Sequence, residues 1–167
     1  MAKARAAAEP DDIPRPDEIE GAPHPSATAR LFGQQSAEEA FLRAWSAGRL
    51  HHAWLLSGPR GVGKATAAYR MARALLIHGD AAPKNLDCEP DDQVSRRIAA
   101  RSEPRLRTVT RPWDREKKRL RGEITIDVVR DLRDFLHLSA ADGGWRTAIV
   151  DAADELNVSA ANALLKI

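Results

Sequence analysis

Cysteine is nearly absent from the sequence, and long apolar runs and aromatic residues are also scarce. The single cysteine, Cys88, excludes an internal disulfide and a four-cysteine zinc site. No apolar run approaches the ~20 residues that would span a bilayer. The first ten residues also lack the apolar core of a secretory signal. These absences favour a cytoplasmic protein with no membrane partner and no bound zinc.

An excess of either charge is also missing. Lys and Arg number 26 against 24 Asp and Glu, so any contact with nucleic acid must come from a local patch. One such patch lies between Arg111 and Glu123, with six basic and three acidic residues. The interleaved acids and the single aromatic, Trp113, favour a solvated hairpin. Contact with a phosphate backbone is the alternative.

The 167 residues, 43% of them apolar, are enough for one domain with a sizeable core. The beginning of the chain has little to bury, because EPDDIPRPDEIEGAPHP carries six acidic residues and five prolines. Residues 1–28 are therefore predicted to be a disordered, acidic and proline-rich tail, with order beginning near Leu31. A partner-binding acidic arm is the alternative. Residues 29–167 are predicted to form the folded part.

Helical and extended patterns alternate through the folded part. A helix with Ser36 as its N-cap is predicted to bury Phe41 and Trp45. The run HAWLLS, residues 52–57, reads as a buried strand. Further predicted elements are a helix from Gly63 to His78, a short helix capped by Asp91 or Asp92, strands around Leu106 to Val109 and Thr147 to Val150, a helix through Leu132, and a final helix after Asn157. This alternation predicts an α/β fold with a mostly parallel sheet.

Between the second and third of these elements, Gly58 to Lys64 reads GPRGVGK, the G-x-x-x-x-G-K spacing of a phosphate-binding loop. Glycines let the backbone curl until several N–H groups point at one anion, and the following helix adds the positive end of its dipole. Lys64 would place its ammonium against the β- and γ-phosphates. The candidate nucleotide-binding residues are Gly58, Pro59, Arg60, Gly61, Val62, Gly63, Lys64, Ala65, Thr66 and Asp151.

Two positions lack the residues that ATP hydrolysis normally uses. Ala65 stands where a Ser or Thr hydroxyl ligates Mg²⁺, and Thr66 points about 100° further around the helix. Asp151, after the predicted strand 147–150, could hold Mg²⁺ through a water. The next residue, Ala152, replaces the glutamate that activates water in many ATPases. Because either loss costs orders of magnitude in rate, the sequence predicts no catalytic residue and no metal ligand in this chain.

Two stretches carry a resemblance to a known family. HHAWLLSGPRGVGKATAAYRMARALL and ITIDVVRDLRDFLHLSAADGGWRTAIVDAADELNVSAANALLK resemble the delta prime family of bacterial DNA polymerase III clamp-loader subunits, which are AAA+ proteins. The most specific piece, ADELNVSAANALLK, is similar to the clamp-loader signature ADxMxxxAxNALLK. The resemblance covers about residues 30–167. It implies a P-loop AAA+ three-layer sandwich, truncated before the sheet and the C-terminal domains are complete.

The resemblance also implies a function. The expected role is a non-motor subunit of a hetero-pentameric clamp loader, with other clamp-loader subunits as partners and indirect contact with the sliding clamp and primed DNA. The expected cofactor is ATP with Mg²⁺, bound without efficient hydrolysis. Zinc is not expected, because HGDAAPKNLDCEPDD keeps only Cys88 where many relatives have a four-cysteine module. The arginine finger, sensor and collar are expected beyond residue 167.

Two other functions remain open. The chain is alternatively an active P-loop AAA+ ATPase that tolerates Ala65, which predicts Mg²⁺-dependent turnover. It is alternatively a DNA-binding accessory domain that uses the basic loop at residues 111–123.

Overall fold

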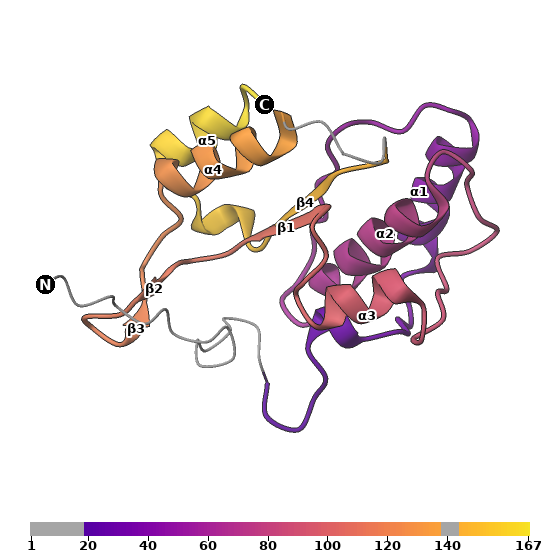
Figure 1. Ribbon diagram of the computed structural model, residues 1–167, viewed down its shortest axis with the longest axis horizontal. Coiled ribbons are helices and arrows are strands. Elements are labelled where there is room, and N and C mark those ends of the chain that lie inside the picture. Colours follow the sequence, from indigo (N-terminus) through magenta and orange to yellow (C-terminus); the bar gives the residue numbers. More distant parts are fainter. Residues whose placement is uncertain (1–18, 138–143) are drawn as a thin grey trace, which may run out of the picture.

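The computed structural model describes residues 19–137 and 144–167, and Figure 1 shows the arrangement of their elements. The elements in chain order are η2 (Pro25–Ala27), α1 (Gln35–Ser46), α2 (Lys64–His78), α3 (Gln93–Ala99), β1 (Leu106–Val109), β2 (Trp113–Asp114), β3 (Arg119–Leu120), α4 (Ile126–His137), β4 (Thr147–Val150), η3 (Ala153–Glu155) and α5 (Val158–Leu164). None of the helices in this described part is both long and apolar enough to cross a membrane.

The sheet at the centre consists of two parallel strands, β1 and β4, within the described residues. Leu106 pairs with Thr147, and the register runs on to Val109 opposite Val150. The chain then leaves β1 and forms the short antiparallel hairpin β2–β3, which lies to the left of the sheet in Figure 1. The β2–β3 pair lies within residues 111–123, the segment for which the sequence favoured a solvated hairpin.

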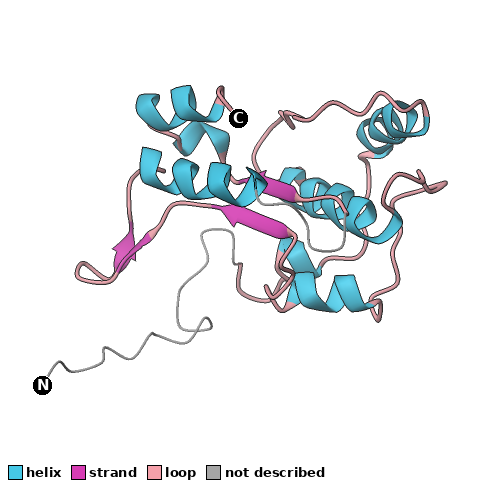
Figure 2. Ribbon diagram, turned by 45° about the horizontal axis from the view of Figure 1, so that its top comes forward, coloured by secondary structure: helices cyan, strands magenta, loops and turns pink. Residues whose placement is uncertain are grey.

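Helices cover both faces of the parallel pair, as Figure 2 shows. On one face, Ile149 of β4 packs with Tyr69, Ala72 and Leu76 of α2 and with Ile98 of α3. On the other face, apolar side chains of α4 and α5 pack against the two strands, and they form a cluster with Val109, Ile124, Leu132, Phe135, Val150 and Leu164. The α/β class and its parallel pairing are confirmed. The complete three-layer AAA+ sandwich, and its truncation, stay predictions.

The predicted N-cap is confirmed for α3 and wrong for α1. Asp92 caps α3, and its carboxylate accepts hydrogen bonds from the N–H groups of Val94 and Ser95 at 2.8 and 3.2 Å. The prediction of Ser36 as the N-cap of α1 is wrong, because the helix starts at Gln35 and Gln34 makes no side-chain cap bond. The Gln34 amide instead donates to the Val62 carbonyl at 3.1 Å, so a tertiary contact fixes the helix start.

The predicted buried strand at residues 52–57 is also wrong. These residues form no strand, and the Leu55 side chain is 82% exposed. A strand needs a neighbour to pair its N–H and C=O groups. Within residues 19–137 and 144–167, β1 and β4 pair only with each other. Residues 52–57 therefore have the composition of a strand but no neighbouring strand with which to pair. Trp54 still lies edge-on to the Phe41 ring, with centroids 5.2 Å apart.

Packing begins earlier in the chain than Leu31, where the sequence placed the start of order. Ser26 in η2 is 1% exposed, and its carbonyl accepts a hydrogen bond from Arg73 Nη2 at 2.6 Å. Arg73 is itself buried on α2, and burial lowers the pKa of its guanidinium. The segment around Ser26 therefore closes over α2 and belongs to its packing.

Candidate functional site

The loop from Gly58 to Gly63 has the curled backbone that its glycines predict. Gly58, Gly61 and Gly63 have φ of 149°, 85° and 89°, values that side chains disfavour. Gly63 is in the left-handed region directly before α2 and serves as its N-cap. The loop is exposed from Gly58 to Gly61 and half-buried beyond that. Three of the candidate residues therefore have backbone conformations that favour glycine, as the predicted loop requires.

The start of α2 leaves backbone donors for a ligand. The first intrahelical bond runs from the Ala67 N–H to the Gly63 carbonyl at 2.9 Å. The N–H groups of Lys64, Ala65 and Thr66 precede it, and no side chain caps them. Such donors, together with the helix dipole, suit an anion. The geometry therefore fits a phosphate group at this helix end.

Lys64 contacts its own loop. Its ammonium donates to the carbonyl oxygens of Gly58 and Pro59, each at 2.9 Å. The side chain is half-buried and bends back over the loop that precedes it. An incoming phosphate would offer the same ammonium charge-assisted hydrogen bonds, which are stronger than those to neutral carbonyls. Lys64 is therefore positioned beside the loop and can exchange these partners for an anion.

A contact that the sequence reasoning missed holds the loop from outside. A Cβ atom placed on Gly63 would lie 2.6 Å from Leu31 Cδ1. The same stretch supplies Gln34, whose amide reaches the Val62 carbonyl. Gly63 therefore has a packing reason as well as a conformational reason to lack a side chain. Leu31 is only one of many apolar residues in the sequence, so no local signal identified it.

Asp151 lies on a different element from the loop. It follows β4 at the carboxyl end of the sheet and is half-buried, and its N–H donates to the Val109 carbonyl at 2.9 Å. The next acidic residues do not gather around it as a metal site: Glu155 pairs with Arg111 at 3.0 Å, and Asp154 is exposed. The described residues contain no group of three or more His, Cys, Asp or Glu that could hold a metal ion.

The donor set thus fits one part of a Mg²⁺–ATP complex and not the other. The loop and α2 offer N–H donors and an ammonium, which suit phosphate oxygens. Ala65 offers no oxygen at the position that would ligate Mg²⁺. The arrangement can grip an anion, and it lacks the side-chain anchor for the metal.

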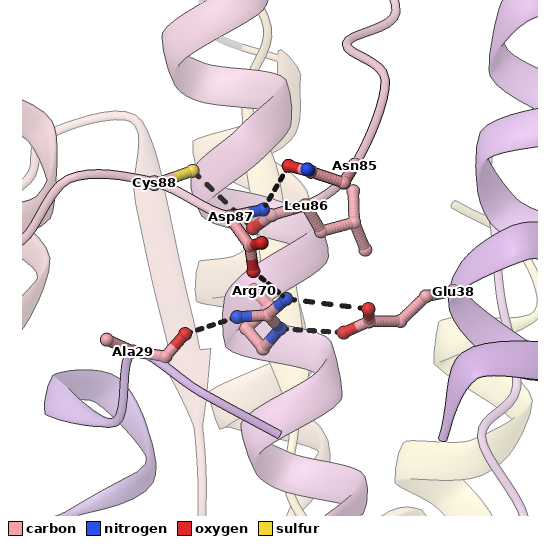
Figure 3. Close-up of polar contacts among 7 residues, drawn as sticks. All are labelled: Ala29, Glu38, Arg70, Asn85, Leu86, Asp87 and Cys88. Atoms are coloured by element: carbon pink, nitrogen blue, oxygen red, sulfur yellow. Dashed lines mark hydrogen bonds and ion pairs between the residues drawn. The ribbon is translucent and has the colours of Figure 1, made fainter. Parts of the chain in front are cut away.

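A buried arginine on α2, Arg70, connects this helix to three other segments of the chain, as Figure 3 shows. Arg70 is 3% exposed; it pairs with Glu38 of α1 at 2.6 Å and with Asp87 of the following loop at 2.9 Å, and it donates to the Ala29 carbonyl. Burial alone would lower the pKa of Arg70, but the hydrogen bonds to Glu38 and Asp87 outweigh it and raise the pKa. Four segments of the chain therefore meet at one guanidinium group.

Cys88, drawn beside this network in Figure 3, is half-buried and donates its S–H to the Leu86 carbonyl at 3.7 Å. Burial raises the pKa of its thiol, although Arg73 and Arg70 oppose the shift. The Cys88 side chain packs against the apolar cluster that contains Phe41, Leu75 and Leu86.

Comparison with known proteins places these features in a family. The model of the family described as "DNA polymerase III, delta subunit" matches residues 33–167. The chain is 37% identical over 116 residues to DNA polymerase III subunit delta' of Pseudomonas aeruginosa, a match that covers 69% of this chain and 32% of that protein.

Other relatives carry different subunit names. The chain is 30% identical over 150 residues to DNA polymerase III subunit gamma of Buchnera aphidicola, covering 85% of this chain and 36% of that protein. It is 33% identical over 144 residues to subunit gamma/tau of Mycobacterium tuberculosis, covering 86% and 23%. The matches therefore span about a third or less of the length of these relatives.

Proposed function

The chain belongs to the DNA polymerase III delta-subunit family, and from this premise we propose that it is a non-motor subunit of delta prime type in a clamp-loader complex. In this role it binds ATP without hydrolysing it efficiently. It assembles with other clamp-loader subunits, which together place a sliding clamp on primed DNA.

The observation that carries this proposal is the methyl group of Ala65 in the first turn of α2. The backbone donors and Lys64 suit the phosphates, while the hydroxyl that would fix Mg²⁺ is missing. Ala152, directly after Asp151, removes the carboxylate that would orient the attacking water. A site that lacks both the hydroxyl and the carboxylate would still bind ATP but would not hydrolyse it efficiently.

The alternative is an active ATPase, and one observation favours keeping it. The similarity to proteins named gamma and gamma/tau covers a larger share of this chain than the similarity to the delta' protein does. An active enzyme would compensate for Ala65 by holding Mg²⁺ through Asp151 and the triphosphate alone.

Restoring the missing hydroxyl provides the test of the proposal. We expect the unmodified chain to bind a fluorescent ATP analogue with nearly equal affinity in Mg²⁺ and in EDTA, because no side chain at position 65 ligates the metal. Ala65→Thr should bind at least about tenfold more tightly in Mg²⁺ than in EDTA, a difference of about 1.4 kcal/mol. Titration by fluorescence anisotropy measures both ratios.

Two controls separate specific binding and turnover from background. Lys64→Ala should abolish binding in both conditions, since the loop then loses its only ammonium. Phosphate release by the unmodified chain should equal that of Lys64→Ala. Release that depends on Mg²⁺ and on Lys64 would contradict the non-motor proposal and establish the ATPase alternative.

A further inference from the structure

A hollow of about 680 Å³ lies along one edge of β1, and no residue of the phosphate loop lines it. β1 leads from the loop after α3 to the β2–β3 hairpin (Figure 1). The lining of the hollow includes Arg101 after α3, Leu106, Arg107 and Thr108 of β1, and Arg115 between β2 and β3. We call this site the β1-edge hollow.

The β1-edge hollow carries positive charge that no carboxylate offsets. Arg101, Arg107 and Arg115 are exposed, and none of them forms an ion pair with a residue that the structure describes. Among the described lining residues only Glu103 is acidic, and it is buried and already paired with two arginines outside the hollow, each at 2.9 Å. The hollow therefore favours an anionic occupant.

Arg107 is held in place by an aromatic ring and not by an acid. Its guanidinium lies over the Phe135 ring of α4, 5.4 Å from the ring centroid. A ring attracts the face of a guanidinium through its quadrupole and leaves the N–H donors at the guanidinium edge available. Arg107 can therefore receive a carboxylate on the α4 face of β1.

β1 is paired on one side only. In the described part of the chain its sole neighbour is β4. The Thr147 N–H donates to the Arg105 carbonyl and the Asp151 N–H to the Val109 carbonyl, each at 2.9 Å. Because pairing alternates along a parallel ladder, the odd-numbered residues of β1 turn their backbone groups toward β4. The even-numbered residues turn theirs toward the hollow.

Three backbone groups of β1 are therefore open to the hollow: the Leu106 carbonyl, the Thr108 N–H and the Thr108 carbonyl. The Leu106 N–H is not among them, because it donates to the Glu103 carbonyl at 3.2 Å. The open groups form a row of two acceptors with one donor between them. A row of this kind at a strand edge is a template for another strand.

This row of groups distinguishes between possible occupants. The phosphate oxygens of a nucleic acid only accept hydrogen bonds, so they would pair with the Thr108 N–H and leave both carbonyls without a donor. A second copy of this chain, paired edge to edge, would bring the arginines of both copies together, and like charges on neighbouring strands are destabilising. An extended peptide offers N–H and C=O groups at every second residue and matches all three groups.

The side chains of β1 indicate where such a peptide should carry its acids. Thr108 directs its side chain to α2, where its Oγ1 forms a hydrogen bond with the Tyr69 hydroxyl at 3.2 Å. Arg107 lies on the opposite face, beside α4. A peptide residue paired with Thr108 has its own side chain on the α2 face, and the residues before and after it lie on the face of Arg107. An acid at every second position therefore suits the site.

From these observations we propose that the β1-edge hollow is a docking site for an extended acidic segment of a partner polypeptide. The segment adds a strand to the sheet beside β1. Its alternate carboxylates meet Arg107 on the α4 face, and those toward its ends meet Arg101 and Arg115. The site is separate from the phosphate loop, so the proposal does not depend on the function proposed above.

Binding of a synthetic peptide to the whole chain tests the proposal. The probe is a fluorescein-labelled heptapeptide in which Glu and Thr alternate, with Glu at both ends. Its binding is followed by fluorescence anisotropy at about 50 mM salt, where charges are only partly screened. We expect saturable binding with a Kd below about 1 mM. Failure to approach saturation at that protein concentration would overturn the proposal.

The role of the arginines is tested by two matched variants. The first replaces the three arginines of the hollow together: Arg101→Gln, Arg107→Gln and Arg115→Gln. The control replaces three exposed basic residues outside the lining: Lys117→Gln, Lys118→Gln and Arg119→Gln. The first variant should bind the probe at least about tenfold more weakly than the unmodified chain, because three charge-assisted contacts are lost. The control should change the affinity less than about threefold.

Equal losses in the two variants would mean general attraction between charges and would overturn the proposal. All six substitutions are at exposed positions, so the circular dichroism spectra of both variants should match that of the unmodified chain.

Strand pairing is tested on the probe, with no change to the protein. A probe with Pro in place of every Thr keeps its charge but lacks the N–H donors that would face Leu106 and Thr108. It should bind at least about tenfold more weakly than a probe with Ala in place of every Thr, which keeps these donors. Equal binding of the two probes would exclude strand pairing and overturn the proposal.

Competition separates an acidic peptide from a nucleic acid. The unlabelled Glu–Thr peptide should displace the probe at least about tenfold more effectively than an oligo-dT of equal charge, because phosphate oxygens leave the two carbonyls without a donor. An oligo-dT that competes equally well would make the hollow a nucleic-acid site and overturn the assignment.

Discussion

Arg70 and Arg43 both form ion pairs with a glutamate of α1, yet their surroundings differ. The Arg70 side chain is 3% exposed and the Glu38 side chain 17%, whereas the Arg43 and Glu39 side chains are 70% and 65% exposed. A buried pair keeps its attraction because little water screens it, and removal of one partner leaves an uncompensated charge. An exposed pair of the same kind contributes little. Burial, which the sequence does not display, decides the difference.

A matched pair of substitutions follows from this contrast. Arg70→Met strands Glu38 and the Ala29 carbonyl, so we expect it to lower the free energy of unfolding by about 3 kcal/mol. Arg43→Met should lower it by less than about 1 kcal/mol. Urea denaturation followed by circular dichroism measures both. Similar losses for the two variants would contradict the view that Arg70 joins α2 to its neighbours.

At the scale of single elements, α3 shows what a local signal can fix. Its seven residues make it too short to be stable alone, and its start depends on the Asp92 carboxylate. Asp92→Ala should therefore lower the free energy of unfolding by about 1 kcal/mol, and Asp92→Asn by less because the amide oxygen still accepts. Thermal melts compare the stability of the unmodified chain with that of the two variants. If Asp92→Ala were as stable as the unmodified chain, packing alone would hold α3.

The β2–β3 hairpin is the second element with a testable property. Asp114 accepts hydrogen bonds from the N–H groups of Lys117 and Glu116, which lower the pKa of its carboxyl and hold the turn. Lys117 and Lys118 are exposed beyond it, with acidic residues interleaved. We expect this hairpin to be a solvated element.

Neutralising Lys117, Lys118 and Arg119 with Gln should therefore change the affinity of the whole chain for single-stranded DNA by less than about twofold. Binding is measured by anisotropy between 50 and 200 mM salt. If the hairpin instead contacts phosphates, three lost contacts would reduce the slope of log affinity against log salt by about 2. A change of that size would support the DNA-binding alternative.

For the whole molecule, the exposed apolar surface concerns assembly. Leu55, Val158 and Leu165 are each at least 78% exposed, and they lie outside the three apolar clusters. Leu55 precedes the loop at Gly58, whereas Val158 and Leu165 lie at the two ends of α5. Exposed apolar side chains of this size are available to another chain that covers them. Because the chain belongs to a family of polymerase subunits, we propose that other subunits of the complex cover these side chains.

The prediction at this scale is co-assembly. We expect this protein to purify as a stoichiometric complex when it is co-expressed with the clamp-loader subunits of the same source. Lys64→Ala should leave that complex unchanged, because a supporting subunit does not need turnover to assemble. Size-exclusion chromatography with light scattering measures the stoichiometry. A protein that elutes alone beside a complete complex of the others would contradict the clamp-loader proposal.

Several features were determined by the sequence alone, because their causes are local. Glycine spacing set the curl of the loop at Gly58 to Gly63, since only glycine adopts these φ values without strain. Helical periodicity located α2 and α4, and two adjacent aspartates limited the cap of α3 to Asp91 or Asp92, of which the structure shows Asp92. The absence of a hydroxyl at Ala65 was equally visible, because side-chain chemistry needs no fold to be read.

Other features were decided only by the tertiary structure, because they depend on which distant segments become neighbours. Residues 52–57 have the composition of a strand, yet pairing requires a partner, and β1 and β4 are the only strands paired in parallel in the described part of the chain. Gln34 turns to Val62 and sets the start of α1, and Arg70 gathers Glu38, Asp87 and Ala29 from three segments. Burial and pairing are properties of the assembled chain, so no local pattern encodes them.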